Sequence, residues 1–136
     1  MKCKTIDYSK RFLVTGAAGF IGSYLSKRLL EEGCEVIGLD NINDYYDINL
    51  KEQRLEMLKP YDNFTFIKED IANKEAIQKI FEQYKPNYVV NLAAQAGVRY
   101  SIENPDVYIQ SNVIGFYNIL EACRSYPVDH LVYASS

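Results

Sequence analysis

The sequence predicts an α/β fold: a doubly wound parallel sheet of about five strands between two layers of helices. Short apolar runs alternate along the chain with longer segments of helical period. Most of these runs are continuously apolar, as in strands that are buried on both faces. A glycine-rich turn follows the first run directly. Because strands that are separated by helices lie parallel and are joined by right-handed crossovers, these observations predict a three-layer architecture.

The individual elements follow from the apolar spacing and from residues that end helices. Strands are expected at residues 11–16, 35–40, 63–70, 87–93 and 130–134. Helices are expected at residues 20–30, 73–85 and 106–125, and a further one at about 47–58. Their apolar stripes are Ile21, Leu25 and Leu29; Ile77, Ile80, Phe81 and Tyr84; and Ile109, Val113, Phe116, Leu120 and Cys123. Gly33 and Pro86 mark the ends of two helices.

Composition excludes several classes of protein. The 136 residues are 48% hydrophobic, which is enough for a core, and we expect one domain over residues 1–136. The net charge is −3, so no basic face for a nucleic acid is expected. No apolar run approaches the roughly 18–20 residues of a membrane span, so no membrane partner is expected. The polar start, MKCKTIDYSK, lacks the apolar core of a secretory signal.

The cysteines and the single histidine predict neither a metal site nor a disulfide framework. Cys3, Cys34 and Cys123 are odd in number, far apart and without the spacing of zinc ligands. Free thiols favour a reducing compartment, and a cytoplasmic location is therefore expected. His130 directly precedes an apolar run, so we interpret it as a residue at the edge of a strand rather than as a catalytic base.

The strongest motif is the stretch TGAAGFIG, residues 15–22, between the first predicted strand and the first predicted helix. Gly16, Gly19 and Gly22 have G-x-x-G-x-x-G spacing. In a dinucleotide site the first glycine permits a tight turn, the second lets a pyrophosphate approach the backbone, and the third lets the helix pack closely. The phosphates would lie at the positive end of the helix. A plain strand-to-helix turn is the alternative.

Asp40 strengthens the dinucleotide interpretation. It ends the second predicted strand, 18 residues after Gly22, close to the position expected for a ribose-binding acid. A carboxylate there would accept hydrogen bonds from the ribose hydroxyls and would repel a 2′-phosphate, so NAD is expected rather than NADP. The alternative is that Asp40 only caps the strand. Together the motifs predict a Rossmann-type NAD-binding domain.

These motifs resemble those of the extended short-chain dehydrogenase/reductase family, which comprises NAD-dependent epimerases and dehydratases of nucleotide sugars. KEDI (68–71), NLAAQAGV (91–98) and NPDVYIQSNVIGFYNILEACR (104–124) support the resemblance. It implies that Asp70 meets the adenine amino group, that Ile71 meets the ring, and that small residues leave room beside the fourth strand. The implied cofactor-binding residues are Gly16, Gly19, Phe20, Ile21, Gly22, Asp40, Asn41, Asp70, Ile71, Ala93, Ala94, Gln95 and Asn112.

Two longer stretches narrow the resemblance. LDNINDYYDINLKEQRL and AAQAGVRYSIENPDVYIQSN are similar to UDP-glucuronate 4-epimerases, which make precursors of capsular and other surface polysaccharides. The resemblance implies a nucleotide-sugar substrate, UDP-glucuronate, and a homodimer of the full-length protein. UDP-glucose 4-epimerases and nucleotide-sugar 4,6-dehydratases are the alternatives within the family. A non-catalytic module that binds a dinucleotide or a partner is the alternative of another class.

Three side chains near the expected site have two interpretations each. Arg99 could recognise the sugar carboxylate through a bidentate pair, or could instead pair with Glu103 or Asp106. Tyr45 and Tyr46 could line the adenosine end of the cofactor site, although packing of their own loop is the favoured interpretation.

The reaction that the resemblance implies needs a tyrosine base supported by lysine in Tyr-x-x-x-Lys. No tyrosine of the 136 residues is followed by lysine at that spacing. We therefore expect the N-terminal, cofactor-binding part of an enzyme, inactive by itself. The closing YASS places Ser135 and Ser136 where the family binds the sugar, and Ser136 is the candidate for the catalytic hydroxyl. The alternative is that both serines are only polar residues at the end of the last strand, with no functional role.

Overall fold

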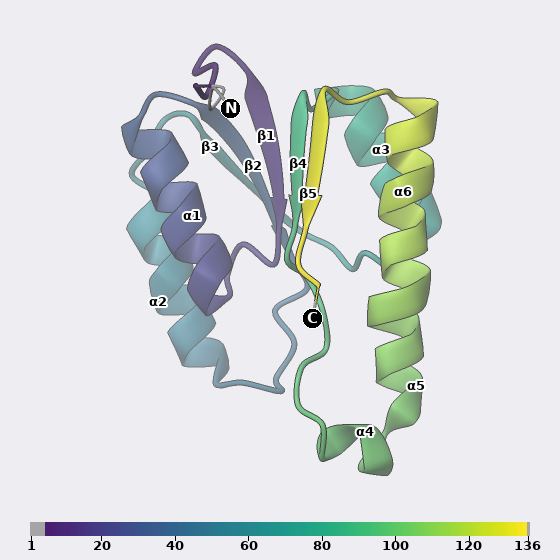
Figure 1. Ribbon diagram of the computed structural model, residues 1–136. Helices are drawn as coiled ribbons and strands as arrows, with labels where there is room; N and C mark the ends of the chain where they lie inside the picture. Colours follow the sequence, from purple (N-terminus) through teal and green to yellow (C-terminus); the bar gives the residue numbers. More distant parts are fainter. Residues whose placement is uncertain (1–4, 136) are drawn as a thin grey trace.

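The structure, a computed structural model, describes residues 5–135 and contains a sheet of five parallel strands (Figure 1). The strands are β1 (Arg11–Thr15), β2 (Glu35–Asp40), β3 (Phe64–Lys68), β4 (Tyr88–Asn91) and β5 (His130–Tyr133). Their order is β3-β2-β1-β4-β5, so the chain builds the sheet outward in both directions from β1. This is the doubly wound Rossmann-type topology, and it confirms the predicted fold class.

Helices cover both faces of the sheet (Figure 1). The helices α1 (Phe20–Glu31) and α2 (Ile48–Leu58) lie on one face, and α3 (Lys74–Tyr84) and α6 (Phe116–Ser125) lie on the other. Phe12 and Val14 of β1 belong to the core beneath α1 and α2, whereas Leu13 belongs to the core beneath α3 and α6. Strand β1 is thus buried on both sides, which explains why its sequence is continuously apolar.

Helix α3 forms where its sequence predicts. Ile77 and Phe81 are fully buried on one side of it. Asn73 caps its N-terminus by accepting a hydrogen bond from the Ala76 amide at 3.2 Å. Lys85, with φ +45°, takes a left-handed conformation after the last turn, directly before Pro86. Capping, burial and termination therefore all agree with the apolar spacing.

The prediction of a single helix at residues 106–125 is wrong in its details. The structure has α5 (Pro105–Tyr108), a π-helical segment η1 (Ile109–Gly115) and then α6, with a short α4 (Tyr100–Glu103) before them. A π turn admits one extra residue, which apolar spacing of three and four does not reveal. The expected stripe is also not the buried one, because Ile109, Val113 and Leu120 are exposed while Ile119 and Ala122 are buried.

None of the helices in the described part of the chain combines the length and the apolar character that a membrane crossing requires. Within residues 5–135, Cys34 and Cys123 are free thiols, and Cys3 lies outside the described residues. Cys34 is completely buried, and Cys123, a residue of α6, packs against the margin of the core.

Cys123 leads to a first prediction, on thiol reactivity. Burial raises the pKa of its thiol from 9.0 to about 11, and only the thiolate reacts quickly with alkylating reagents. We expect slow labelling of Cys123 in the folded protein near neutral pH and faster labelling as the pH approaches 11. Because the folded-state pKa is the higher one, the shift also removes stability as the pH rises from about 9 through about 11.

Alkylation that is followed by peptide mass spectrometry measures this rate for each cysteine separately. The protein unfolded in urea is the control, in which Cys123 should label as an ordinary thiol. Equal labelling rates at neutral pH in the folded and unfolded states would contradict the prediction.

Candidate dinucleotide site

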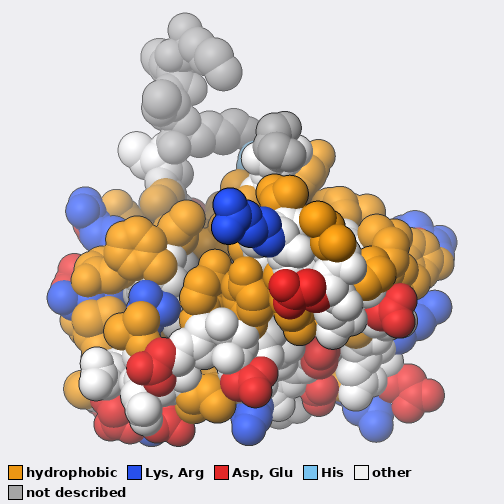
Figure 2. All heavy atoms as spheres, turned by 90° about the horizontal axis from the view of Figure 1, so that it is seen from below, with side chains coloured by type: hydrophobic (Ala, Val, Ile, Leu, Met, Phe, Trp, Pro, Cys, Tyr) orange, Lys and Arg blue, Asp and Glu red, His pale blue; other side chains and the backbone are white. Residues whose placement is uncertain are grey.

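A cavity of about 330 Å³ opens at the carboxyl ends of the strands, beside the neighbouring strands β1 and β4, where the order of the strands reverses. Open α/β sheets bind ligands at this position. Figure 2 looks onto the molecule from this side and shows hydrophobic side chains over much of it. Phe20, Ile21 and Tyr46 line the cavity and are more than half exposed.

Twelve of the thirteen predicted cofactor residues line this cavity, and Asn112 is the exception. The twelve are Gly16, Gly19, Phe20, Ile21, Gly22, Asp40, Asn41, Asp70, Ile71, Ala93, Ala94 and Gln95. The other lining residues are Leu39, Asn43, Tyr45, Tyr46, Lys51, Glu69, Leu92, Ala96, Ser111 and Ala134. The fold therefore brings the predicted residues together from the ends of four different strands.

The glycine loop leaves the first turn of α1 open toward the cavity. Gly16 has φ +71°, and a Cβ there would lie 3.0 Å from the Ala93 nitrogen. A Cβ at Gly22 would overlap the carbonyl oxygen of Gly16 and lie 2.8 Å from its carbon. Gly19 is the N-cap of α1, without a side-chain cap bond and without an acidic residue in the first turn. The first amides of a helix have no intrahelical partner, so this end is suited to an anion.

Thr15 joins the ends of β1 and β4 beneath the loop. It is fully buried, and its hydroxyl donates to Asn91 Oδ1 at 2.6 Å. The same oxygen accepts hydrogen bonds from the amides of Leu92 and Ala93, each at 3.1 Å. The hydroxyl thus positions the backbone of Ala93, which lines the cavity.

Asp40 ties the glycine loop to the loop that follows β2. It is only 6% exposed. Its Oδ2 accepts a hydrogen bond from the Ala18 amide at 3.0 Å, and its Oδ1 accepts one from the Ile42 amide at 2.8 Å. A carboxylate has about four acceptor positions, so Asp40 retains capacity for a ligand in the cavity that it lines.

Asp40→Ala tests the predicted ribose contact. We expect weaker NAD binding and a narrower preference for NAD over NADP, because the carboxylate would both accept the ribose hydroxyls and repel a 2′-phosphate. Calorimetric titration with each dinucleotide measures both quantities. Asp70→Ala is the matched control, because a contact to adenine should affect the two dinucleotides equally. Unchanged affinity and preference in Asp40→Ala would contradict the ribose assignment.

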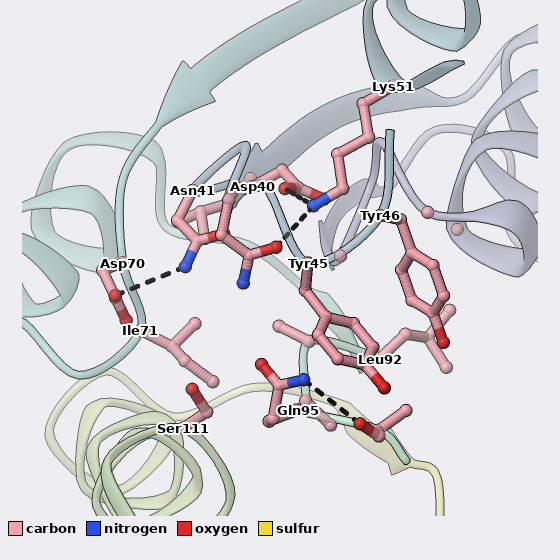
Figure 3. A pocket seen from close by; sticks show the side chains of 18 of the residues that line it. Asp40, Asn41, Tyr45, Tyr46, Lys51, Asp70, Ile71, Leu92, Gln95 and Ser111 are labelled. Carbon is pink, nitrogen blue, oxygen red and sulfur yellow. Dashed lines mark hydrogen bonds and ion pairs between the residues drawn. The ribbon is translucent and has the colours of Figure 1, made fainter. Parts of the chain in front are cut away.

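Asp70 and Ile71 form the part of the cavity next to β3. Asn41 Nδ2 donates to Asp70 Oδ2 at 3.4 Å (Figure 3). Asp70 Oδ1 accepts a hydrogen bond from the Ala72 amide at 2.8 Å. Ile71 is buried, and a Cβ on Gly115 would lie 2.5 Å from its Cγ1. Segment η1 therefore packs directly against Ile71, and Gly115 is the residue that permits this approach.

Asn112 contacts the backbone after β4 instead of lining the cavity. Its Oδ1 accepts a hydrogen bond from the Gln95 amide at 2.8 Å, and its Nδ2 donates to the Gln95 carbonyl at 3.0 Å. Gln95 is 7% exposed and lines the cavity. The structure thus gives Asn112 a positioning role, and the π turn in which it lies presents its amide to Gln95.

The favoured interpretation, that Tyr45 and Tyr46 only pack their own loop, is incomplete. Both line the cavity, and their ring centroids lie 4.7 Å apart (Figure 3). The Tyr45 ring also packs against the Tyr100 ring, with 5.0 Å between the ring centroids. Gly97, with φ +96°, has no room for a Cβ beneath the Tyr45 hydroxyl. The loop after β2 therefore reaches the loop after β4 across one side of the cavity.

Of the predicted substrate residues, the two that the structure describes lie outside the cavity lining. Arg99 and Ser135 are exposed and do not line it, although Ala134 does. Among the described residues Arg99 forms no ion pair, so the alternative pairing with Glu103 or Asp106 is not observed. Ser136 lies outside the described residues.

Sequence reasoning missed Lys51. It lies on α2, is 6% exposed and lines the cavity, where its Nζ donates to Asn43 Oδ1 at 2.9 Å. Lysine is almost never fully buried without a partner, but its tertiary partners leave no signal in a polar helical segment. In residues 5–135 no group of three or more His, Cys, Asp or Glu side chains is placed to hold a metal ion.

These residues fit a dinucleotide. The backbone of Gly16 leaves no room for a side chain at Gly22. The resulting close approach of the glycine loop to α1 forms a cradle under the first turn of the helix. The cavity volume is at the lower end of the range of small-molecule sites, roughly 300–1,000 Å³. Donors at one end and the carboxylates of Asp40 and Asp70 further along provide complementary partners for a pyrophosphate, a ribose and an adenine.

Comparison with known families agrees with this geometry. The model of the GDP-mannose 4,6-dehydratase family matches residues 13–136. The chain belongs to this family. The match confirms the resemblance that the motifs predict, to the epimerases and dehydratases of nucleotide sugars.

Relatives of this GDP-mannose 4,6-dehydratase family member include named epimerases. It is 55% identical to Protein CapI of Staphylococcus aureus, over 93% of this chain and 37% of the relative. It is 50% identical to the UDP-glucuronate 4-epimerase of Thermodesulfobacterium geofontis, over 92% of this chain and 39% of the relative. The chain therefore spans well under half the length of these relatives.

Solved structures share the fold. The UDP-glucuronic acid 4-epimerase of Bacillus cereus, in complex with UDP-glucuronic acid and NAD, superposes with a TM-score of 0.85 and 34% identity, over 93% of this chain and 40% of that one. The UDP-glucose 4-epimerase of Thermus thermophilus, in complex with NAD, superposes with a TM-score of 0.78 and 38% identity, over 93% of this chain and 37% of that one. Both neighbours are nucleotide-sugar 4-epimerases that hold NAD.

Proposed function

We propose that this chain is the NAD-binding part of a nucleotide-sugar 4-epimerase that acts on UDP-glucuronate. The observation that carries the proposal is the open first turn of α1, which faces the same cavity as Asp40. The relatives named UDP-glucuronate 4-epimerase support the substrate, and the neighbours that were crystallised with NAD support the cofactor.

The residues of the cavity would divide the cofactor between them. The glycine loop and the first amides of α1 would hold the pyrophosphate, and Asp40 would accept the ribose hydroxyls. Asp70 and Ile71 would bind the adenine, while Ala93 and Ala94 leave room beside β4. Bound NAD would supply a hydride acceptor that later returns the hydride, so that C4 of the sugar is inverted without net redox change.

The sugar side of the site would use residues from two segments. Arg99, which directly precedes α4, would pair with the sugar carboxylate. Ser135 and Ser136, which follow β5 in the sequence, would hydrogen-bond the sugar, with Ser136 nearest the reacting oxygen. A tyrosine base with its lysine would come from a further part of the protein, since these 136 residues contain no Tyr-x-x-x-Lys. A homodimer and a role in making surface polysaccharide precursors also belong to the proposal.

Calorimetric titration of the 136-residue chain with NAD tests the cofactor. We expect binding that is measurable but weaker than micromolar, because part of the nicotinamide pocket would be supplied by other residues of the protein. Absence of any NAD binding by folded protein would contradict the dinucleotide assignment. Sub-micromolar affinity would instead contradict the expectation that the pocket is incomplete.

An assay of the full-length gene product with UDP-glucuronate and UDP-glucose tests the activity. We expect C4 inversion of UDP-glucuronate by the full-length protein and none by residues 1–136 alone. Preferential conversion of UDP-glucose, or loss of water from the sugar, would replace the proposed substrate with one of the alternatives. Turnover by the 136 residues would contradict the proposal that the base lies elsewhere.

The exposed edge at β5 favours one second candidate, a non-catalytic module that binds a partner. Val132 and Tyr133 are about half exposed, at 47% and 52%, on a strand that ends the sheet. The coding sequence after Ser136 separates the candidates, because a Tyr-x-x-x-Lys there supports the enzyme and a stop codon supports the module.

A further inference from the structure

A buried ion pair lies at the Asp40 end of the cavity. Lys51 Nζ is 3.7 Å from Asp40 Oδ1, and the two side chains are only 8% and 7% exposed. The same ammonium donates to Asn43 Oδ1 at 2.9 Å. Figure 3 shows Lys51 reaching from α2 toward Asp40, and all three residues line the cavity. Charge of both signs is therefore present at the position predicted for the ribose.

The carboxylate of this pair is immobilised from two sides. The amides of Ala18 and Ile42 each donate to one of its oxygens. Asp40 thus cannot turn away from Lys51 without losing backbone hydrogen bonds. The ammonium is similarly confined, because removing it from both Asp40 and Asn43 would leave a buried charge without partners.

The pair alters the expected response to a 2′-phosphate. A lone carboxylate would repel such a phosphate, but Lys51 offsets this charge within a few ångströms. While the carboxylate of Asp40 is in place, its negative charge offsets the positive charge of Lys51, so the pair attracts a phosphate only weakly. With an uncharged side chain in place of Asp40, the positive charge of Lys51 would no longer be offset, and the ammonium could bind the phosphate as cationic residues do in NADP sites.

We infer that Lys51 is a specificity-determining residue, and that Asp40 excludes NADP mainly by holding the ammonium of Lys51. This inference rests on the proposed NAD site and goes beyond it, since it assigns the selectivity to a residue on α2. Loss of Asp40 should then produce an NADP site only while Lys51 is present.

The experiment is a double-mutant cycle on cofactor preference. Dissociation constants for NAD and NADP are measured by calorimetry, at one ionic strength, for the unaltered protein, Asp40→Asn, Lys51→Gln and the double variant. Asp40→Asn should shift the ratio of the two constants toward NADP by about tenfold or more, as one gained bond to a charged group would. The double variant should lose most of this gain.

Two further variants serve as controls. Lys51→Met keeps the apolar stem of the side chain and should behave as Lys51→Gln does. Lys59→Gln removes a cation from the exposed end of the same α2 region, where it pairs with Glu56, and should leave the ratio unchanged. Because both dinucleotides are titrated into one preparation, a partly unfolded fraction cancels from the ratio.

The outcomes separate this inference from the proposed function. A gain toward NADP that persists in the double variant would assign the phosphate to another cation and overturn the inference. Arg54 of α2, which donates to the Ala18 carbonyl at 3.3 Å, is such a cation. An unchanged ratio in Asp40→Asn with NAD binding retained would also overturn it. Absence of binding of either dinucleotide by the folded, unaltered protein would overturn both the inference and the NAD site.

Discussion

Gly22→Ala is expected to lower NAD affinity by about a hundredfold or more, equivalent to the loss of two hydrogen bonds to charged phosphate oxygens. The new methyl group would overlap the carbonyl oxygen of Gly16 and lie 3.2 Å from Ala17 Cα. These are backbone atoms, so no side-chain rotation relieves the contact. Either α1 or the loop must move, and the amides that face the cavity then move away from the phosphates. Overpacking of this kind also costs about 1–3 kcal/mol of stability.

Gly33→Ala is the matched control for that variant. Gly33 also follows a regular element, but a Cβ there would meet no atom within 4 Å. Its φ of +91° means that alanine is strained, by about 1–2 kcal/mol. We expect lower stability and an unchanged NAD affinity, measured by thermal unfolding and calorimetry. If Gly22→Ala binds NAD as well as Gly33→Ala does, the proposed contact between α1 and the pyrophosphate is wrong.

Thr15→Val is expected to lower the free energy of unfolding by about 2–4 kcal/mol, although it changes volume very little. The hydroxyl is buried and bonds Asn91, Leu92 and Ala93 at once. Valine would leave the Ala93 amide and the Asn91 amide oxygen without this partner. The backbone of Ala93 should relax toward the cavity, so NAD binding should weaken as well.

Thr15→Ser separates the hydroxyl from the methyl group. It keeps the three hydrogen bonds and removes one buried methyl, for a cost of about 1 kcal/mol. Urea unfolding of both variants provides the measurement. Comparable losses in Thr15→Ser and Thr15→Val would show that packing, rather than the hydrogen-bond network, accounts for the effect.

The cavity end of the sheet could be predicted because its signals are local. Continuous apolar runs such as residues 11–16 indicate buried strands, and only glycine can occupy positions such as Gly16 and Gly22. Asp40 could be placed at the same edge, because the carboxyl ends of parallel strands coincide. The prediction of twelve lining residues thus depends on the fold class being correct.

Features that depend on partners far away in the sequence could not be predicted. Lys51 is one of several polar residues on α2, and only the fold reveals that it reaches Asp40. The π turn of η1 is specified by contacts of Asn112 and Gly115 with segments after β4 and β3. The buried side of α6 was missed because Asn118 and Ala122 are polar or small. Asn118 is nonetheless 2% exposed, with its amide donating to the Ile71 carbonyl at 2.9 Å.

The central place of β1 has a consequence for the order of events during synthesis. One edge of β1 pairs with β2, which follows it closely, but its other edge pairs with β4. Thr15 and Asn91 are separated by 76 residues, which a ribosome adds in about 4–15 s at roughly 5–20 residues per second. During that interval the first three strands can pair while one edge of β1 has no partner. The wall of the cavity that follows β4, which includes Ala93 and Ala94, is therefore completed late, after the glycine loop, Asp40 and Asp70 have been synthesised.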